Sequence, residues 1–152
     1  MKTIFITCFI LILCCTLIQE SQAQAQNIFS KESIYDFETT YQKALHVINE
    51  KKLHLFYVVD HSEAAKQVGK TMENTKVIIF GNPNIGTDIM NLYPTIAIEL
   101  PLKLLIYEKN GKTFVVFISP ESYLPQHGIP TEHAFIKSTQ NLLLNITTTI
   151  TQ

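Results

Sequence analysis

The sequence predicts an α+β fold, a single domain whose mostly antiparallel sheet of about six strands carries helices on one face. Three observations support this fold class. The two long stretches of helical periodicity lie at the ends of the chain, over residues 33–51 and from residue 131 onwards. Short apolar stretches lie between these ends. Asn110-Gly111 separates two of the stretches and is typical of a type I′ hairpin turn.

The first 25 residues are expected to be a signal peptide. Residues 4–18 form an uncharged run of 15 residues after Lys2, and Ala23-Gln24-Ala25 supplies a small-x-small cleavage site. At a rise of about 1.5 Å per residue this run spans roughly 22 Å, less than the ~30 Å hydrocarbon core of a bilayer. We therefore expect cleavage near Ala25 and an exported protein, periplasmic or extracellular, with no membrane anchor afterwards.

The cysteines indicate how the mature chain holds together. All of them, Cys8, Cys14 and Cys15, lie inside the expected signal peptide, so the mature domain would contain no disulfide. We expect residues 26–29 to be a short tether and residues 30–150 to form one domain. A chain of roughly 130 residues is long enough to enclose one hydrophobic core.

The charge balance argues against a nucleic-acid partner. The 12 basic residues are all lysine, and the formal net charge is −1. Cleavage would remove Lys2 together with Glu20, which leaves this balance unchanged. There is no surplus of positive charge to neutralise phosphates and no guanidinium for bidentate contacts.

The first elements are a short strand and a helix. Residues 28–29 are expected to form the strand, and the helix begins at Ser30 or Ser33 and ends near Lys51. Ser33 and Asp36 have the spacing of a capping box. The apolar face of this helix repeats at helical spacing and comprises Ile34, Phe37, Tyr41, Ala44, Leu45 and Ile48.

A second strand is expected over residues 53–59. Both of its faces are mostly apolar, which predicts a central position in the sheet. Asp60 is a natural N-cap for a short helix, which would bury Val68 and Met72 and contain or end at Gly69.

A third strand is expected over residues 77–80 and ends at Gly81-Asn82-Pro83. Proline keeps the preceding residue out of the helical region, so Asn82 should lie in a sharp turn. Thr87 is expected to cap a short helix that Pro94 stops.

The remaining strands are expected over residues 95–99, 102–108 and 112–119, with the hairpin turn between the last two. A proline-punctuated loop then leads to the C-terminal helix. The apolar stripe of that helix comprises Phe135, Ile136, Thr139, Leu142, Leu143 and Ile146.

One face of the sheet needs a cover that this chain does not supply. The strands that contain Leu53, Ile78 and Val115 look apolar on both sides, whereas the two terminal helices can cover one face only. A second copy of the chain would bury the other face, so we expect a homodimer.

Several motifs together identify a family resemblance. They are Asp60-His61-Ser62-Glu63-Ala64-Ala65-Lys66-Gln67-Val68-Gly69, Val77-Ile78-Ile79-Phe80-Gly81-Asn82-Pro83, Gly86-Thr87, Met90, Glu99-Leu100-Pro101-Leu102-Lys103 and the hairpin. In this order they resemble the family named domain of unknown function (DUF) 302, over residues 30–123. The resemblance implies one small α+β domain with about six strands and a dimer, and it implies no defined activity. Many members carry Asp before the Leu-Pro pair, where this chain has Glu99.

Two chain reversals carry the candidate ligand-binding residues. Asp60 and His61 follow one strand, and Asn82 and Thr87 follow the next. If these strands run parallel and adjacent, their ends share one edge of the sheet, and helix N–H groups would complete a pocket for a small polar ligand. The alternative is that Asp60 only caps its helix and that Gly-Asn-Pro is only a rigid turn.

His61 also suggests an enzyme. It could act as the acid or base of a hydrolase- or isomerase-type reaction, oriented by Asp60 or by Glu99. Nothing in the spacing requires His127 to reach His61. The five histidines, His46, His54, His61, His127 and His133, lack the spacing of a metal motif, so we expect neither a metal nor a cofactor.

The sequence therefore leaves three functions open. The first is an exported homodimer that binds a small polar ligand near Asp60, His61, Asn82 and Thr87, with Glu99 as a further candidate. The second is an enzyme that uses His61. The third is a structural or dimerisation module without a ligand. The sequence contains neither a nucleophile elbow nor a metal motif, and this favours binding over catalysis.

Overall fold

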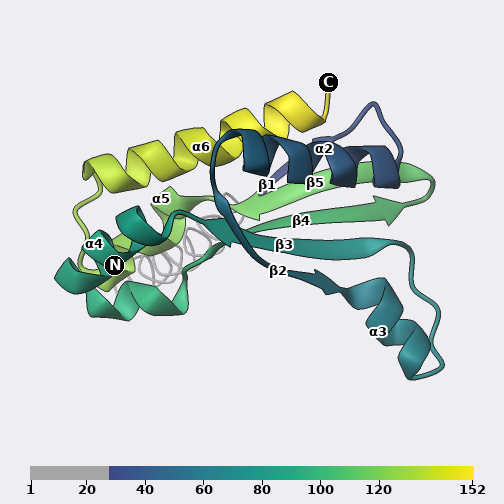
Figure 1. Cartoon of the computed structure of the whole chain (residues 1–152), viewed down its shortest axis with the longest axis horizontal. Helices are drawn as coiled ribbons and strands as arrows, with labels where there is room; N and C mark the ends of the chain where they lie inside the picture. Colours follow the sequence, from purple (N-terminus) through teal and green to yellow (C-terminus); the bar gives the residue numbers. More distant parts are fainter. Residues whose placement is uncertain (1–27) are drawn as a thin grey trace, which may run out of the picture.

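Five strands form one antiparallel sheet in the order β1-β5-β4-β3-β2 (Figure 1). The computed structural model describes residues 28–152, so the expected signal peptide and residues 26–27 of the expected tether lie outside the described part of the chain. The strands are β1 (Ile28–Glu32), β2 (His54–Asp60), β3 (Thr75–Gly81), β4 (Leu102–Lys109) and β5 (Lys112–Ile118). The α+β single-domain fold is confirmed.

Two long helices, α2 (Phe37–Glu50) and α6 (Ala134–Ile150), pack on the same face of the sheet (Figure 1). α3 (His61–Gln67) lies beyond one end of the sheet, and α4 (Pro83–Leu92) lies at the opposite end (Figure 1). The remaining elements are short: η1 (Pro94–Ile98), α5 (Pro120–Tyr123) and η2 (Leu124–His127). Among the described residues, no helix has the length and apolarity to cross a bilayer.

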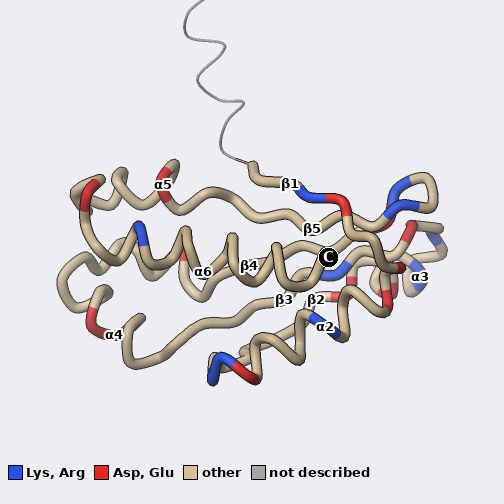
Figure 2. The backbone as a smooth tube through the Cα atoms, turned by 90° about the horizontal axis from the view of Figure 1, so that it is seen from above, with Lys and Arg blue, Asp and Glu red and all other residues tan. Residues whose placement is uncertain are grey.

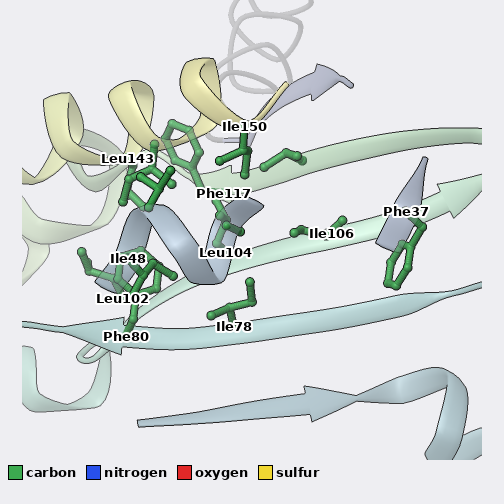
Figure 3. Packing of buried hydrophobic residues seen from close by; sticks show 14 residues of the cluster. Phe37, Ile48, Ile78, Phe80, Leu102, Leu104, Ile106, Phe117, Leu143 and Ile150 are labelled. Atoms are coloured by element: carbon green, nitrogen blue, oxygen red, sulfur yellow. The ribbon is translucent and has the colours of Figure 1, made fainter. Parts of the chain in front are cut away.

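The main core lies between the sheet and the two long helices (Figure 3). Alternate residues of β3 and β4 point into it, including Ile78, Phe80 and Leu104, which are fully buried. Leu143 and Ile150 of α6 close it from above. In this core, alternate residues of the strands pack against residues of α6 that repeat at helical spacing, as the sequence predicts.

A second, smaller core lies apart from the first. It consists of Ile89, Ile96, Leu124, Ile129 and Ile136. These residues come from α4, η1, η2, the loop after η2 and the first turn of α6. Leu100 packs against both cores, so the two meet at the segment that enters β4.

The sheet has five strands rather than about six, because residues 95–99 are not a strand. Pro94–Ile98 forms the 3₁₀-helix η1, with Glu99 N–H donating to Ile96 O at 2.9 Å. Pro94 occupies the first turn, where its missing N–H costs nothing. The backbone groups of this segment are satisfied locally instead of by a neighbouring strand.

The expected central position of β2 is also wrong. β2 pairs only with β3 and forms an edge of the sheet. Phe56 and Tyr57 are 45% and 67% exposed, and the register shifts between Leu55 and Tyr57. The apolar residues on both faces of β2 therefore do not reflect burial between two strands.

Three expected helix details are wrong for local reasons. Asp36, not Ser33, caps α2 and accepts a hydrogen bond from Thr39 N–H at 2.7 Å. Asn82, not Thr87, caps α4, and Pro83 occupies its first turn. α3 ends at Gln67, so the expected core residues Val68 and Met72 lie past its end and are exposed.

The hairpin and the C-terminal helix agree with the predictions made from the sequence. Asn110 and Gly111 both have positive φ, 55° and 73°, as a type I′ turn requires. β4 and β5 pair on either side of this turn. The apolar stripe of α6 is buried or half-buried at every predicted position.

The second face of the sheet is called the open face here, because no described helix covers its middle (Figure 1). The register and the alternation of burial assign to it the apolar residues Tyr57, Val59, Val77, Ile79, Leu105, Tyr107, Phe114, Val116 and Ile118, together with the charged Glu32 and Lys103. Most are half-buried by their neighbours, whereas Tyr57 and Ile118 are 67% and 55% exposed. A contiguous apolar face of this kind is uncommon on a monomer.

Candidate functional site

The two chain reversals that carry the predicted site residues lie at opposite ends of the sheet. β2 and β3 are antiparallel, with Asp60 opposite Lys76 and His54 opposite Gly81. α3 extends beyond the end of β2, and the chain returns from there into β3 (Figure 1). The expected convergence of Asp60 and His61 with Asn82 at one edge is therefore wrong, because it required parallel strands.

At the α3 end, Asp60 is engaged in capping. Its Oδ1 accepts hydrogen bonds from Ser62 Oγ at 2.7 Å and from Glu63 N–H at 2.8 Å. Lys76 Nζ lies 3.4 Å from Oδ2. The hydrogen bond from Ser62 is the largest cause that lowers the pKa of Asp60, and the Glu63 N–H and the Lys76 charge lower it further against the effect of burial. His61 is exposed beside this cap.

At the other end, Asn82 caps α4. Its Oδ1 accepts from Asn84 N–H at 3.1 Å and from Ile85 N–H at 3.5 Å. These bonds satisfy two of the N–H groups that every helix leaves unpaired at its start. They leave the side-chain NH₂ group of Asn82 without a protein partner in the described part of the chain.

A cavity of about 520 Å³ opens beside Asn82. It is called the α4–α6 cavity here, after two of the helices that line it. Its lining is Leu53, Phe56, Gly81, Asn82, Pro83, Ile85, Gly86, Met90, Leu100, Pro101, Leu102, Phe135, Ser138, Thr139 and Leu142. Apolar side chains dominate this lining, and no charged residue belongs to it.

Two glycines keep part of this cavity free. A methyl group on Gly81 would lie 3.8 Å from Phe56 and from Pro101, and one on Gly86 would lie 3.9 Å from the end of Met90. Because Gly86 occupies the second turn of α4, a larger side chain there would project into the cavity with little resistance from the backbone.

Three polar side chains line the cavity. Thr139 is only 6% exposed as a residue, and it belongs to the cavity lining. Ser138 Oγ already donates to Phe135 O at 3.0 Å. Thr139 and the NH₂ group of Asn82 therefore remain as hydrogen-bonding groups for a bound molecule.

The last two predicted site residues do not line this cavity. Thr87 lies inside α4 and is exposed. Glu99 follows η1, and its Oε1 lies 3.5 Å from His127 Nε2. His127 therefore lies near Glu99, at the end of the fold away from His61. No three His, Cys, Asp or Glu side chains within residues 28–152 are grouped closely enough to hold a metal ion.

Sequence reasoning missed His127 and Thr139 as site residues. In the sequence, Thr139 belongs to the apolar stripe of α6 and is therefore predicted to be a core residue. His127 lies in a loop whose position depends on contacts between η1 and η2, and no periodic pattern reports such contacts. Burial together with Glu99 raises the pKa of Tyr123, on neighbouring α5, to about 12.

The family described as domain of unknown function DUF302 matches residues 29–148. This match covers most of the chain. The chain belongs to this family. A crystal structure of an uncharacterised conserved DUF302 protein from Bacillus stearothermophilus has a TM-score of 0.76 at 14% identity, covering 83% of this chain and 99% of that one. At this identity, the likeness shows the fold alone.

Two curated relatives of this DUF302 chain carry the name of an ion channel. "Fluoride-specific ion channel FluC 1" of Brucella suis is 30% identical over 99 residues, which are 64% of this chain and 39% of the relative. "Fluoride-specific ion channel FluC 2" of Brucella melitensis matches at the same identity over 37% of its length. The match thus spans about two fifths of these relatives, and the named activity is a property of the longer proteins.

The Asp60 cap predicts a pH-dependent loss of stability in the Asp60→Ala variant. Removal of an N-cap side chain costs about 0.5–2 kcal/mol. Because folding lowers the pKa of Asp60 below 3.8, its charge stabilises the fold above that pH, and this contribution disappears as the pH falls through the folded-state pKa. Urea unfolding followed by circular dichroism should therefore show a loss near pH 7 that shrinks near pH 3.

The Asp88→Ala variant is the matched control, because Asp88 is exposed within α4 and caps no helix. It should unfold like the wild-type protein at both pH values. A loss in Asp60→Ala that is equal at both pH values would contradict a charged cap.

Proposed function

We propose that this domain binds a small, mainly apolar molecule in the α4–α6 cavity. A volume of about 520 Å³ lies within the range of small-molecule sites, roughly 300–1,000 Å³. The observation that carries the proposal is the combination of this volume with a lining that is apolar apart from three polar side chains, those of Asn82, Ser138 and Thr139.

Charge distribution supports an apolar rather than a polar ligand. Charged residues gather toward the α3 end (Figure 2), whereas α4 and α6 each carry one, Asp88 and Lys137. A small polar ligand of the kind expected from the sequence would leave most of the cavity lining in contact with water or polar groups. A ligand with an apolar body would remove that same surface from water, which favours binding through the hydrophobic effect.

The polar groups of the cavity suggest one hydrogen-bonding end on the ligand. The Thr139 hydroxyl can donate or accept, and the Asn82 NH₂ group can only donate. A carbonyl, ether or hydroxyl oxygen would satisfy either group. A charged end is less suited, because no residue of opposite charge lines the cavity.

Catalysis by His61 draws no comparable support. The ring is exposed at the α3 end, and it is not among the residues that line the cavity. Asp60, one of its two expected orienting residues, already caps α3. The other, Glu99, lies near His127 instead.

Substitution of Gly86 tests the binding proposal. In Gly86→Leu the added side chain would fill part of the cavity, so we expect the affinity for the fluorescent apolar probe N-phenyl-1-naphthylamine to fall at least about tenfold, or 1.4 kcal/mol. Fluorescence titration of the purified protein measures this affinity. Melting by circular dichroism, run alongside, reports whether the variant remains folded.

Two matched variants separate cavity filling from other effects. Gly86→Ala adds a single methyl group in a helix and should bind the probe nearly as well as wild type. Asn91→Leu adds the same apolar side chain on an exposed position of α4 that does not line the cavity. Equal affinities for wild type and a folded Gly86→Leu would contradict the proposal.

We also propose that two copies of the chain associate through the open face. Its apolar residues extend across four strands and end in the exposed Tyr57 and Ile118. The formal net charge of −1 leaves little electrostatic repulsion between two copies. Homodimerisation would remove this surface from water.

Light scattering after size exclusion tests the dimer. The double variant Tyr57→Lys with Ile118→Lys places two like charges on the open face, and we expect it to elute as a monomer where wild type elutes as a dimer. Ile34→Lys is the control, because Ile34 is 75% exposed and lies between β1 and α2, away from this face. A monomeric wild-type protein would exclude the proposal.

A further inference from the structure

Three polar side chains meet where η1 packs against η2, and they are called the η1–η2 cluster here. His127 Nδ1 lies 3.1 Å from Thr95 Oγ1, and His127 Nε2 lies 3.5 Å from Glu99 Oε1. The order is hydroxyl, imidazole, carboxylate. We propose that this cluster is a hydrolytic acyl-transfer site for small carboxylic esters, in which Thr95 is the nucleophile, His127 the base and Glu99 the positioning residue.

The imidazole of His127 is the central observation. Its side chain is only 10% exposed, and its Nε2 is buried without an aligned hydrogen bond. Buried polar atoms in this state are rare and call for a physical explanation. The Glu99 carboxylate supplies one, because its Oε1 lies 3.5 Å from Nε2, where a small rotation of either side chain would complete a hydrogen bond.

We assign the ring proton of His127 to Nε2, on the side of Glu99. The lone pair of Nδ1 then faces the Thr95 hydroxyl, 3.1 Å away. In this arrangement His127 can activate the Thr95 hydroxyl as a base, and Glu99 can orient the imidazole. Burial and then the charge of Glu99 raise the pKa of Tyr123 to about 12, which places this carboxylate close to the phenol on α5.

The nucleophile is accessible from solvent. Thr95 is exposed on η1, and the contact between its hydroxyl and His127 Nδ1 is exposed, whereas Nε2 on the other side of the ring is buried. A substrate, and then water, could therefore reach the hydroxyl and Nδ1 from solvent. The cluster is separate from the α4–α6 cavity, because none of its three residues belongs to the cavity lining.

The reaction balances without another reactant besides water. Thr95 Oγ1 forms a bond to the ester carbonyl carbon, and its proton passes to His127 Nδ1. The bond to the leaving oxygen breaks, and this oxygen takes the proton from Nδ1. Water then attacks the acyl-threonine, its proton passes through Nδ1 to Thr95 Oγ1, and the carboxylic acid leaves. One ester and one water give one alcohol and one acid.

Hydrolysis of p-nitrophenyl acetate by the full-length protein tests the site. Thr95→Val keeps the shape of the side chain and removes the hydroxyl, and His127→Asn keeps a group near Nδ1 that is not basic. We expect each to lower kcat/KM about 100-fold or more, the scale of general acid–base catalysis. Thr95→Ser should restore most of the activity, because it retains the nucleophilic oxygen.

Exposed imidazoles also cleave this ester slowly, so the control is another histidine. His61→Ala removes an exposed ring at the far end of the sheet and should leave kcat/KM unchanged. Peptide mass spectrometry of wild type quenched during turnover should find one acetyl group on Thr95. This measurement does not depend on the folding of any variant.

Glu99→Gln tests the positioning role by the split between kcat and KM. Loss of the carboxylate should lower kcat, because the ring of His127 is no longer oriented, and should leave KM unchanged. Glu99→Asp keeps a carboxylate and should recover part of kcat. A merely structural contact would not lower kcat selectively.

Several outcomes would overturn the proposal. These are a folded Thr95→Val variant with wild-type kcat/KM, an equal loss in His61→Ala, and an acetyl group found on lysine and not on Thr95. Each would mean that the η1–η2 cluster only fastens η1 to η2.

Discussion

The antiparallel pairing of β3 with both of its neighbours is the constraint on which the other features depend. It places the last residues of β2 and the last residues of β3 at opposite ends of the sheet, because Asp60 pairs with Lys76 and Gly81 pairs with His54. The α3 end then holds a charged helix cap. The α4 end holds the cavity, the second core and the η1–η2 cluster.

The cavity follows from how the two cores meet. α6 extends past the sheet, so its first turns pack with α4 and the 3₁₀-helices while its later turns pack on the strands. Residues that adjoin the main core, such as Leu53 and Leu142, form one part of the cavity lining. Residues that adjoin the smaller core, such as Met90 and Phe135, form the other. Because glycines occupy two positions between them, the cores do not close over this space.

Features governed by local chemistry could be predicted from the sequence. The hairpin at Asn110-Gly111 needs two residues with positive φ, and the stripe of α6 needs only a helical period. The capping residue does not follow from the sequence alone, because several residues near a helix start can accept hydrogen bonds from the same N–H groups. Asn82, followed by Pro83, caps α4 in place of the predicted Thr87, and Asp36 caps α2 in place of the predicted Ser33.

Features governed by packing could not be predicted. The apolar residues on both faces of β2 fit a central strand and an edge strand with an uncovered apolar face equally well. The sequence therefore predicts a central strand where the structure has an edge strand. Likewise, whether two strands joined by a short helix run parallel depends on the path of that helix in space. The contact between Glu99 and His127 joins residues 28 positions apart in irregular segments, where no period exists.

The central claim is that ligand binding belongs to the α4 end of the sheet and not to the α3 end. Titration of the ¹⁵N-labelled protein with N-phenyl-1-naphthylamine, followed by amide NMR shifts, tests it most directly. The account predicts shifts at Gly81, Gly86 and Thr139, and none at His61 or Glu63. Shifts confined to α3, or spread evenly over both ends, would contradict it.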